Sequence, residues 1–339
     1  MARNFILAVG VAAMLVGVST GALAQQDQKK LKSSAEKNVS TQSQAGVGLR
    51  QDHPPVPPTD AAKPLMVWDV AAADRTGLPR NFRTSDDAVN TKDGKSPSTS
   101  GLNELHASGS GEYTDANLKL MLKKLRGPVT VFDLRQEDHV FVNGEPISWY
   151  ATSNWANVGK SNEAIAASEK ARVAAFKPGM KISLSDAKVK KGAEAAPPAE
   201  NVTVVSAATE RDVVTESGAS YVRITVSDHS RPLDAEVDRF VRAVRSLSPD
   251  SWAHFHCRAG RGRTTTFLAL YDMLRNAGKV ALEDIAQRQS LLAGEYDLLA
   301  PDSGVAEDRT AFVRVFYEYA RANPNGQPQL WSEWLIQQK

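Results

Sequence analysis

The stretch that most constrains the fold of this chain joins an apolar run to an amphipathic run through a glycine-rich loop. Residues 252–255 predict a buried strand, and residues 265–274 predict a helix that ends near Gly278. A strand that passes through a short loop directly into a helix is a building unit of an α/β sheet. The connecting loop, residues 256–264, contains the single cysteine of the chain, Cys257.

This loop has the composition of an anion site with a nucleophile. Backbone N–H groups of a glycine-rich loop and the dipole of the following helix favour a bound anion and the thiolate of Cys257. Arg263 offers a planar fork to two phosphate oxygens, and Thr264 can donate a hydrogen bond to the sulfur. The spacing Cys-x5-Arg-Thr is the signature of cysteine-dependent phosphatases. We predict that His256 braces the loop and that the substrate is bound by Arg258, Ala259, Gly260, Arg261 and Gly262. Alternatively, the side chain of Arg258, of Arg261 or of both faces solvent.

Other interpretations of the loop and of the chain fit less well. A buried structural cysteine does not explain two glycines and three arginines around it. The lysine of a Walker A motif and the third glycine of a dinucleotide fingerprint are both missing. His139, His254 and His256 lack the spacing of metal ligands, so we expect neither a metal nor another cofactor. The sequence contains no Gly-x-Ser-x-Gly elbow, the motif that would indicate a serine hydrolase.

Phosphoryl transfer to a cysteine requires an acid for the leaving oxygen and later a base for water. Asp228 is the best candidate, because it follows a predicted strand on a proline-containing loop upstream of the cysteine. Asp234 and Asp238 compete with it. Asp238 falls within a helical pattern, and Asp234 is placed as the N-cap of that helix.

The first residues predict export. A short positive start precedes an apolar run over residues 5–18 and the small-x-small pattern of residues 22–24. We expect a signal peptide over residues 1–24, cleavage after Ala24, and a periplasmic or secreted protein without a stable membrane anchor; an uncleaved anchor is the alternative. A lone thiol in an oxidising compartment is a liability unless it has a chemical use, which again favours a reactive Cys257.

Composition and pattern divide the rest of the chain. Residues 25–63 are polar and rich in Lys, Ser, Gln and Pro, so they predict a disordered linker before one phosphatase domain over residues 64–339. The 339 residues are 42% hydrophobic and 24% charged, with a net charge of +2. These values are typical of a globular protein, and the sequence has no basic stripe with aromatic residues that would indicate nucleic-acid binding.

Strands alternating with helices predict an α/β fold with a mostly parallel central sheet and helices on both faces. The expected strands include residues 129–134 and 221–226, and the expected helices are residues 115–125, 161–176, 234–247, 282–289 and 309–323. Thr114 is a predicted N-cap, and Asn143-Gly144 predicts a tight hairpin. Short strands around a polar loop in residues 181–207 indicate a small β element within about residues 139–207.

Six motifs outside the loop resemble one family, the bacterial protein-tyrosine-phosphatase-like inositol phosphatases, or cysteine phytases. The motifs are residues 78–84 (LPRNFRT), 105–110 (LHASGS), 132–137 (FDLRQE), 147–150 (ISWY), 155–161 (WANVGKS) and 331–335 (WSEWL). The resemblance runs from about Val67 to the end. It implies a tyrosine-phosphatase α/β core with a small partial β-barrel attached.

The resemblance also implies roles for single residues. Cys257 is the nucleophile, Asp228 the general acid and Arg263 the phosphate clamp. Further contacts with substrate phosphates are implied for Arg83, His229, Lys190 and Arg309. The chain departs from the family where Arg231 replaces the usual tryptophan of the acid loop, and Asn154 stands where some members carry an aspartate. The lysine-rich segment expected before the final helix is also shortened, to residues 299–304.

The expected function is hydrolysis of inositol polyphosphates such as phytate through a cysteinyl-phosphate, without nucleic acid as a partner. The alternatives are a phosphoinositide or phosphotyrosine-protein phosphatase and a non-catalytic phosphoanion-binding protein.

Overall fold

A computed structural model describes residues 65–91, 94, 96–150, 154–185, 199–300 and 307–338 of the chain. The predicted signal peptide, the predicted linker and Lys190 lie outside these residues. None of the described helices combines the length and the apolar character needed to cross a bilayer.

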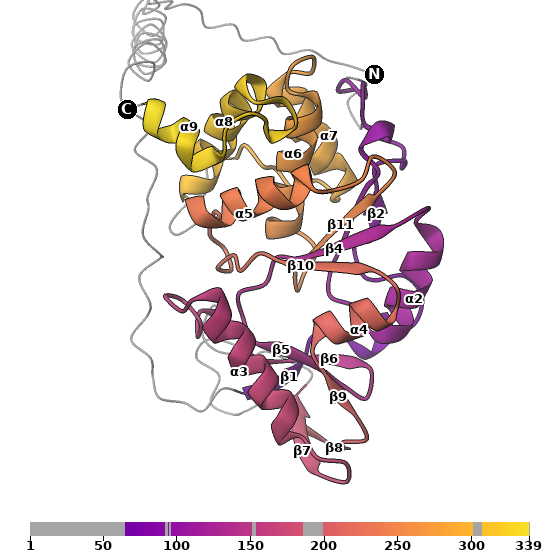
Figure 1. Cartoon of the computed structure of the whole chain (residues 1–339). Helices are drawn as coiled ribbons and strands as arrows, with labels where there is room; N and C mark the ends of the chain where they lie inside the picture. Colours follow the sequence, from indigo (N-terminus) through magenta and orange to yellow (C-terminus); the bar gives the residue numbers. More distant parts are fainter. Residues whose placement is uncertain are drawn as a thin grey trace, which may run out of the picture. The chain divides into compact units, whose positions relative to one another are not determined.

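The central sheet has five strands in the order β10-β4-β11-β3-β2 (Figure 1). Its members are β2 (Arg83–Thr84), β3 (Ala107–Ser110), β4 (Val129–Asp133), β10 (Ser220–Arg223) and β11 (Trp252–His256). Four strands are parallel, and only β2 pairs antiparallel, at the edge beside β3. The mostly parallel sheet predicted from the sequence is therefore confirmed.

Helices cover both faces of this sheet because its strands are apolar on both sides. Phe132 and Phe255 lie in a core with the helices of one face, whereas Val131 and Trp252 lie in a core with the helices of the other. The first face is covered by α5 (Asp234–Arg245), α6 (Gly262–Asn276), α7 (Leu282–Leu292), α8 (Glu307–Ala322) and α9 (Trp331–Gln337), and the second by α2 (Asp115–Lys124) and α4 (Glu210–Glu216). Short 3-10 turns occupy η1 (Ala72–Asp74), η2 (Asn103–Leu105) and η5 (Pro324–Gly326).

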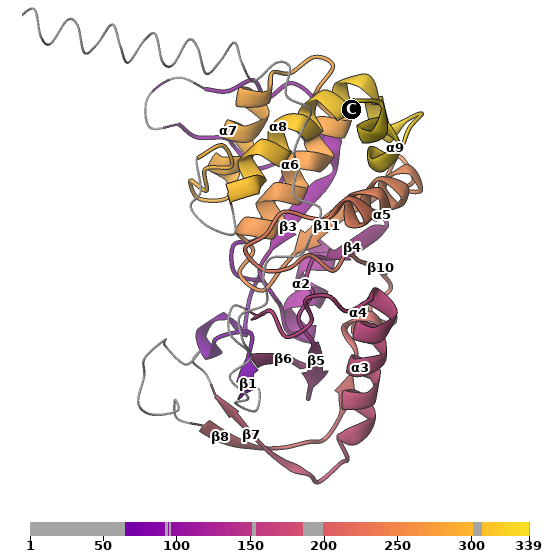
Figure 2. The same ribbon diagram turned by 90° about the vertical axis from the view of Figure 1, so that its left-hand side faces the viewer.

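A second sheet has six strands in the order β8-β7-β1-β6-β5-β9 (Figure 2). Its members are β1 (Leu65–Trp68), β5 (His139–Val142), β6 (Glu145–Tyr150), β7 (Lys181–Ser185), β8 (Ala199–Thr203) and β9 (Ala207–Ala208), and α3 (Asn162–Ala175) packs against it. This is the predicted small β element, with one addition. Its central strand, β1, comes from the start of the domain and pairs with both β6 and β7.

Several local predictions hold because the signals are short-range. Asn143 and Gly144 have φ of 55° and 79° between the paired residues Val142 and Glu145, as a tight hairpin turn requires. Thr114 caps α2 through a capping box with Asn117. The predicted N-cap Asp234 is wrong by one position: Leu233 is the N-cap, and Asp234 is the first helical residue.

Buried charged side chains join the two sheets. Arg135, which follows β4 and is fully buried, donates to Asp69 beyond β1 at 2.8 Å and to Glu137 at 3.0 Å. Arg223, at the end of β10, forms an ion pair with Glu169 of α3. We name this set the inter-sheet charge cluster; its members are Asp69, Glu112, Asp133, Arg135, Glu137, His139, Glu169, Glu210, Arg223 and His256.

Both imidazoles of this cluster, those of His139 and His256, are in the positively charged imidazolium form at neutral pH. Burial opposes the charged ring of His256, but Glu210, whose Oε1 lies 2.9 Å from Nε2, helps to raise the pKa of His256 to about 9. Burial and Arg135 likewise oppose charge on His139, yet Asp133 and Glu169 raise the pKa of this imidazole well above its usual value. Each proton therefore stabilises the folded state.

This cluster predicts a loss of stability at alkaline pH. A raised histidine pKa contributes stability that is complete below the unfolded pKa of about 6.5 and disappears as the pH rises through the folded value. For His256 the window runs from about 6.5 to about 9, and the free energy of unfolding should fall by on the order of 3 kcal/mol across it. Urea unfolding at pH 6.5, 8 and 9.5 measures this change.

The matched variants for this measurement are His256→Gln and His229→Gln. The side chain of His229 is 69% exposed, so its substitution should preserve the slope, whereas His256→Gln should reduce it and leave the part that His139 contributes. A wild-type stability that is constant or that rises over this range contradicts the prediction.

Candidate functional site

The loop between β11 and α6 is held from outside by its carbonyl groups. Asn81 Nδ2 donates to the oxygen of Ala259 at 2.8 Å, Arg83 Nη1 donates to that of Gly260 at 2.9 Å, and the amide of Glu112 donates to that of Arg258 at 3.2 Å. The N–H of a trans peptide points away from its carbonyl. The amides that follow these carbonyls therefore face the opposite side, where an anion can bind.

Only glycine fits at position 260. Its φ is +70°, and a Cβ there would lie 2.3 Å from the amide nitrogen of Gly111. This close approach seats the loop against the end of β3. Gly260 thus shapes the loop from behind and is absent from the residues that line the pocket.

Cys257 lies on the floor of this loop, 3% exposed. Burial disfavours its thiolate, but Arg263 and the hydroxyl of Thr264, which donates to Sγ at 3.2 Å, hold the pKa of Cys257 below its ordinary value. The first turn of α6 begins at Gly262 and adds its dipole. The cysteine is therefore poised as a nucleophile.

Glu137, for which no role was predicted, positions Arg263. Both carboxylate oxygens accept from the guanidinium, at 2.7 and 2.9 Å, and the carbonyl of Val226 accepts at 3.1 Å. Burial opposes the charge of Glu137, but Arg263 and Arg135 hold its pKa well below the usual value. The FDLRQE motif contains Glu137, but its partner lies 126 residues away, and no local pattern indicates that pairing.

Asp228 faces the same floor from the loop after β10. Its Oδ1 lies 3.4 Å from Nη2 of Arg263, and its Oδ2 accepts from Asn154 at 2.7 Å. Trp155 Nε1 donates to its backbone carbonyl at 2.9 Å. Asn154 is therefore a hydrogen-bond donor to the side chain of Asp228.

The two competing aspartates have structural partners. Asp234 accepts from Trp331 Nε1 at 2.8 Å, and Asp238 accepts from the amide of Ser332 at 3.0 Å, so both secure the start of α9. Neither belongs to the residues that line the pocket. Arg231, in place of a tryptophan, is buried with its guanidinium 5.6 Å from the ring centre of Phe312.

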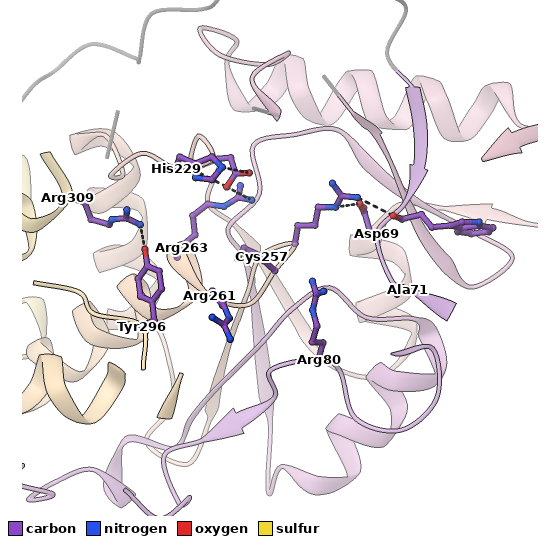
Figure 3. Close-up of a pocket in the computed structure, with 14 residues that line it drawn as sticks. Asp69, Ala71, Arg80, His229, Cys257, Arg261, Arg263, Tyr296 and Arg309 are labelled. Carbon is purple, nitrogen blue, oxygen red and sulfur yellow. Dashed lines mark hydrogen bonds and ion pairs between the residues drawn. The ribbon is translucent and has the colours of Figure 1, made fainter. Parts of the chain in front are cut away.

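A pocket of about 470 Å³ opens above Cys257 (Figure 3). Five arginines and one histidine line it, against two aspartates. The predicted residues in its wall are Cys257, Arg258, Ala259, Arg261, Gly262, Arg263, Asp228, His229 and Arg309; Trp68, Asp69, Ala71, Arg80 and Tyr296 were not predicted. Arg309, from α8, donates to the hydroxyl of Tyr296 at 2.5 Å.

Arg83 does not reach this pocket, contrary to its predicted contact with substrate. It is 4% exposed and donates to Gly260 and to Thr265 Oγ1 at 3.0 Å. Burial and the nearby charge of Arg261 lower the pKa of Arg83 to about 10. Arg83 therefore supports the loop from behind, and Arg80, three residues earlier, lines the pocket.

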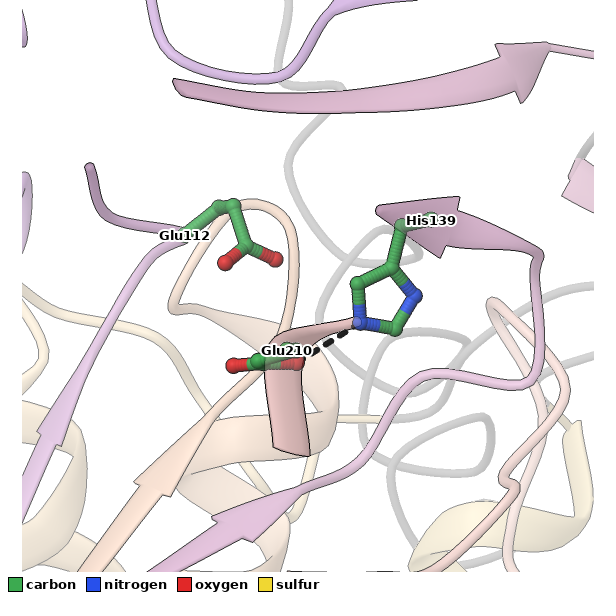
Figure 4. A group of neighbouring side chains, drawn as sticks. All are labelled: Glu112, His139 and Glu210. Atoms are coloured by element: carbon green, nitrogen blue, oxygen red, sulfur yellow. Dashed lines mark hydrogen bonds and ion pairs between the residues drawn. The ribbon is translucent and has the colours of Figure 1, made fainter. Parts of the chain in front are cut away.

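Two overlapping groups of buried side chains have metal-ligand chemistry: Glu112, His139 and Glu210, and Asp133, Glu210 and His256. Figure 4 shows the carboxylates of Glu112 and Glu210 and the ring of His139 facing a common space. His139 and His256 form ion pairs with these carboxylates, and Glu112 also pairs with Arg135. We therefore interpret these side chains as part of the inter-sheet charge cluster. His256, which was predicted to brace the loop, contacts Glu210 of this cluster.

Comparisons with known proteins agree with this geometry. The model of the PTP-like phytase family, whose description reads "Inositol hexakisphosphate", matches residues 132–275. The PTP-like myo-inositol phosphatase from Mitsuokella multacida, solved with myo-inositol-(1,3,4,5)-tetrakisphosphate, is 32% identical with a TM-score of 0.72, over 81% of this chain and 49% of that one. A PTP-like phytase from Bdellovibrio bacteriovorus is 34% identical with a TM-score of 0.68, over 86% of this chain and 100% of that one.

Effector protein hopD2 of Pseudomonas syringae pv. tomato is 34% identical over 292 residues, which are 82% of this chain and 61% of hopD2. The chain thus spans about three fifths of hopD2 and half of the Mitsuokella protein. The Bdellovibrio phytase, by contrast, is matched over its whole length. With this match and the shared α/β fold, the chain belongs to the PTP-like phytase family.

Proposed function

We propose that this protein is a cysteine-dependent phosphatase that removes phosphate from inositol polyphosphates through a cysteinyl-phosphate. One observation carries the proposal: Cys257, Arg263 and Asp228 meet at the floor of one pocket. The sulfur of Cys257 accepts a hydrogen bond from Thr264, and the carboxyl group of Asp228 lies 3.4 Å from the guanidinium of Arg263. The family match and the relative solved with an inositol tetrakisphosphate support the substrate class.

The first step forms a bond between Sγ of Cys257 and phosphorus. The bond from phosphorus to the ester oxygen breaks, and its electron pair goes to that oxygen, which takes a proton from Asp228. Arg263 and the loop amides balance the charge on the other phosphate oxygens. The free alcohol leaves, and the phosphoryl group remains on the cysteine.

The second step returns the enzyme to its starting state. Asp228, now a carboxylate, accepts a proton from water, whose oxygen bonds to phosphorus as the S–P bond breaks. The electron pair returns to the sulfur, where the hydroxyl of Thr264 stabilises the departing thiolate. Inorganic phosphate is the second product.

The charge of the pocket favours a substrate with several phosphates. Five arginines exceed what one scissile phosphate needs, and a volume of about 470 Å³ suits a small ring. Phosphopeptides and phosphoinositide vesicles are the substrates that a panel should set against soluble inositol phosphates. Preference for phosphopeptides would overturn the proposed substrate class.

Substitution of the nucleophile and the acid tests the chemistry. Phosphate release from inositol hexakisphosphate should vanish in Cys257→Ser and fall by about hundredfold or more in Asp228→Asn, since an amide cannot donate or accept the proton. Asp250→Asn, at an exposed aspartate, is the matched control. Full activity of Cys257→Ser refutes the mechanism, and tight binding without turnover by the reduced wild-type protein supports a non-catalytic role.

Glu137→Gln tests the positioning of Arg263. Loss of the carboxylate leaves a buried guanidinium without its bidentate partner, which should lower the free energy of unfolding by about 3–5 kcal/mol. The kcat for an aryl phosphate should fall roughly tenfold or more, because Arg263 loses its orientation. Glu104→Gln, at an exposed glutamate, is the control. A kcat equal to that of wild type shows that Glu137 has no positioning role.

We also propose export to the periplasm or medium, which is supported by the sequence of residues 1–24. Mass spectrometry of protein secreted by a bacterial host should find a mature chain that begins at Gln25. Ala24→Leu, which disrupts the small-x-small pattern, should leave the precursor uncleaved. A wild-type precursor that keeps residues 1–24 contradicts the proposal.

A further inference from the structure

The arginines around the pocket differ in the hydrogen bonds and ion pairs that their guanidinium groups form. Arg258 is nine-tenths buried, with its Nε 2.7 Å from Asp69 Oδ1 and its Nη2 donating to the carbonyl of Trp68 at 3.1 Å. Arg263 is bound to Glu137 and Arg309 to Tyr296. These three guanidinium groups have fixed positions and partners before any substrate binds.

Arg80 and Arg261 form the contrasting pair. Both side chains are exposed and line the pocket, and neither forms a hydrogen bond or ion pair with the described residues. In the view of Figure 3 they lie on the side of Cys257 opposite His229. Two cations without a counter-ion among the described residues therefore line the same pocket, and a bound anion would be attracted to both.

The backbone at both positions is anchored to the catalytic loop. The carbonyl of Arg80 accepts from the amide of Gly111 at 2.8 Å, and the next residue, Asn81, is bonded to Ala259. Arg261 belongs to the loop itself and is the N-cap residue of α6. Backbone contacts thus fix the Cα positions of both arginines beside Cys257, and only their side chains are mobile.

We propose that Arg80 and Arg261 form a second phosphate subsite, which binds a phosphate of the substrate other than the one attacked by Cys257. This inference rests on the proposed function and adds which residues bind a second phosphomonoester of the small polyol ring. Arg258 differs from these two arginines because Asp69 and the carbonyl of Trp68 hold its Nε and Nη2, although its Nη1 has no hydrogen-bond partner among the described residues. A substrate with a single phosphate gains nothing from Arg80 and Arg261.

Binding to the Cys257→Ser protein tests the subsite without turnover. Isothermal titration gives two affinities for each protein, one for inositol hexakisphosphate and one for inorganic phosphate. The measured quantity is the affinity for inositol hexakisphosphate divided by the affinity for phosphate. Arg80→Gln and Arg261→Gln should each lower this ratio about tenfold, the scale of one charge-assisted hydrogen bond. Arg126→Gln, at an exposed arginine outside the pocket, should leave the ratio unchanged.

The outcomes separate the subsite from the proposed function. An unchanged ratio in both variants, or a parent protein that binds inositol hexakisphosphate no better than phosphate, overturns the subsite. An arginine-dependent ratio in a protein whose native cysteine form releases no phosphate from inositol hexakisphosphate upholds the subsite and refutes the proposed function. Both arginines are exposed, so their substitution does not threaten folding.

A second measurement distinguishes the sources of such a ring. Vesicles that contain a phosphatidylinositol trisphosphate present the same ring phosphates as soluble inositol tetrakisphosphate, but on a membrane. Arginine-dependent binding of either one supports the subsite, and the tighter of the two identifies the source.

Discussion

The bidentate pair of Glu137 and Arg263 is the interaction on which the active-site geometry depends. Glu137 also accepts from Arg135, and Arg135 donates to Asp69 beyond the first strand of the second sheet. One carboxylate thus connects Arg263, at the floor of the pocket, to both sheets. A movement of either sheet would shift the guanidinium at the floor of the pocket, so the packing of the whole domain fixes the position of the charge.

Such buried charge carries an energetic cost. Removing ions from water is expensive, and their mutual attraction offsets this cost only when every group is paired in good geometry. In the inter-sheet charge cluster, six carboxyl groups meet two guanidinium groups, so protons on His139 and His256 and the arginines of the adjoining loop supply the remaining positive charge. An apolar interior would be cheaper, but it could not orient Arg263.

The sequence allowed correct prediction where the signal is local. The loop from His256 to Thr264, the turn at Asn143-Gly144 and the cap at Thr114 are each specified by residues within a few positions. The mostly parallel sheet follows from alternating strands and helices. These features depend on backbone preference and hydrophobic period, which a short window of sequence contains.

Features that depend on long-range contacts were missed or misplaced. The pairing of β1 with β6 and β7 joins strands far apart in the chain, and the bond from Glu137 to Arg263 spans 126 residues. Arg80 and Arg83 show the limit best. Both arginines belong to the LPRNFRT motif, yet the turn at Asn81, with φ of 57°, leaves Arg80 in the pocket and Arg83 behind the loop. Composition alone cannot predict which of the two arginines lines the pocket and which supports the loop.

The same reasoning applies to the two arginines of the loop itself. Arg258 and Arg261 are three residues apart and chemically identical, but only Arg258 meets a buried carboxylate. Asp69 accepts from Arg135 and Ser148 and also pairs with Arg258, whereas Arg261 has no ion pair with any of the described residues. The pocket therefore keeps its excess positive charge where the protein supplies no counter-ion. That location, and not the number of arginines, determines where a second anion is bound.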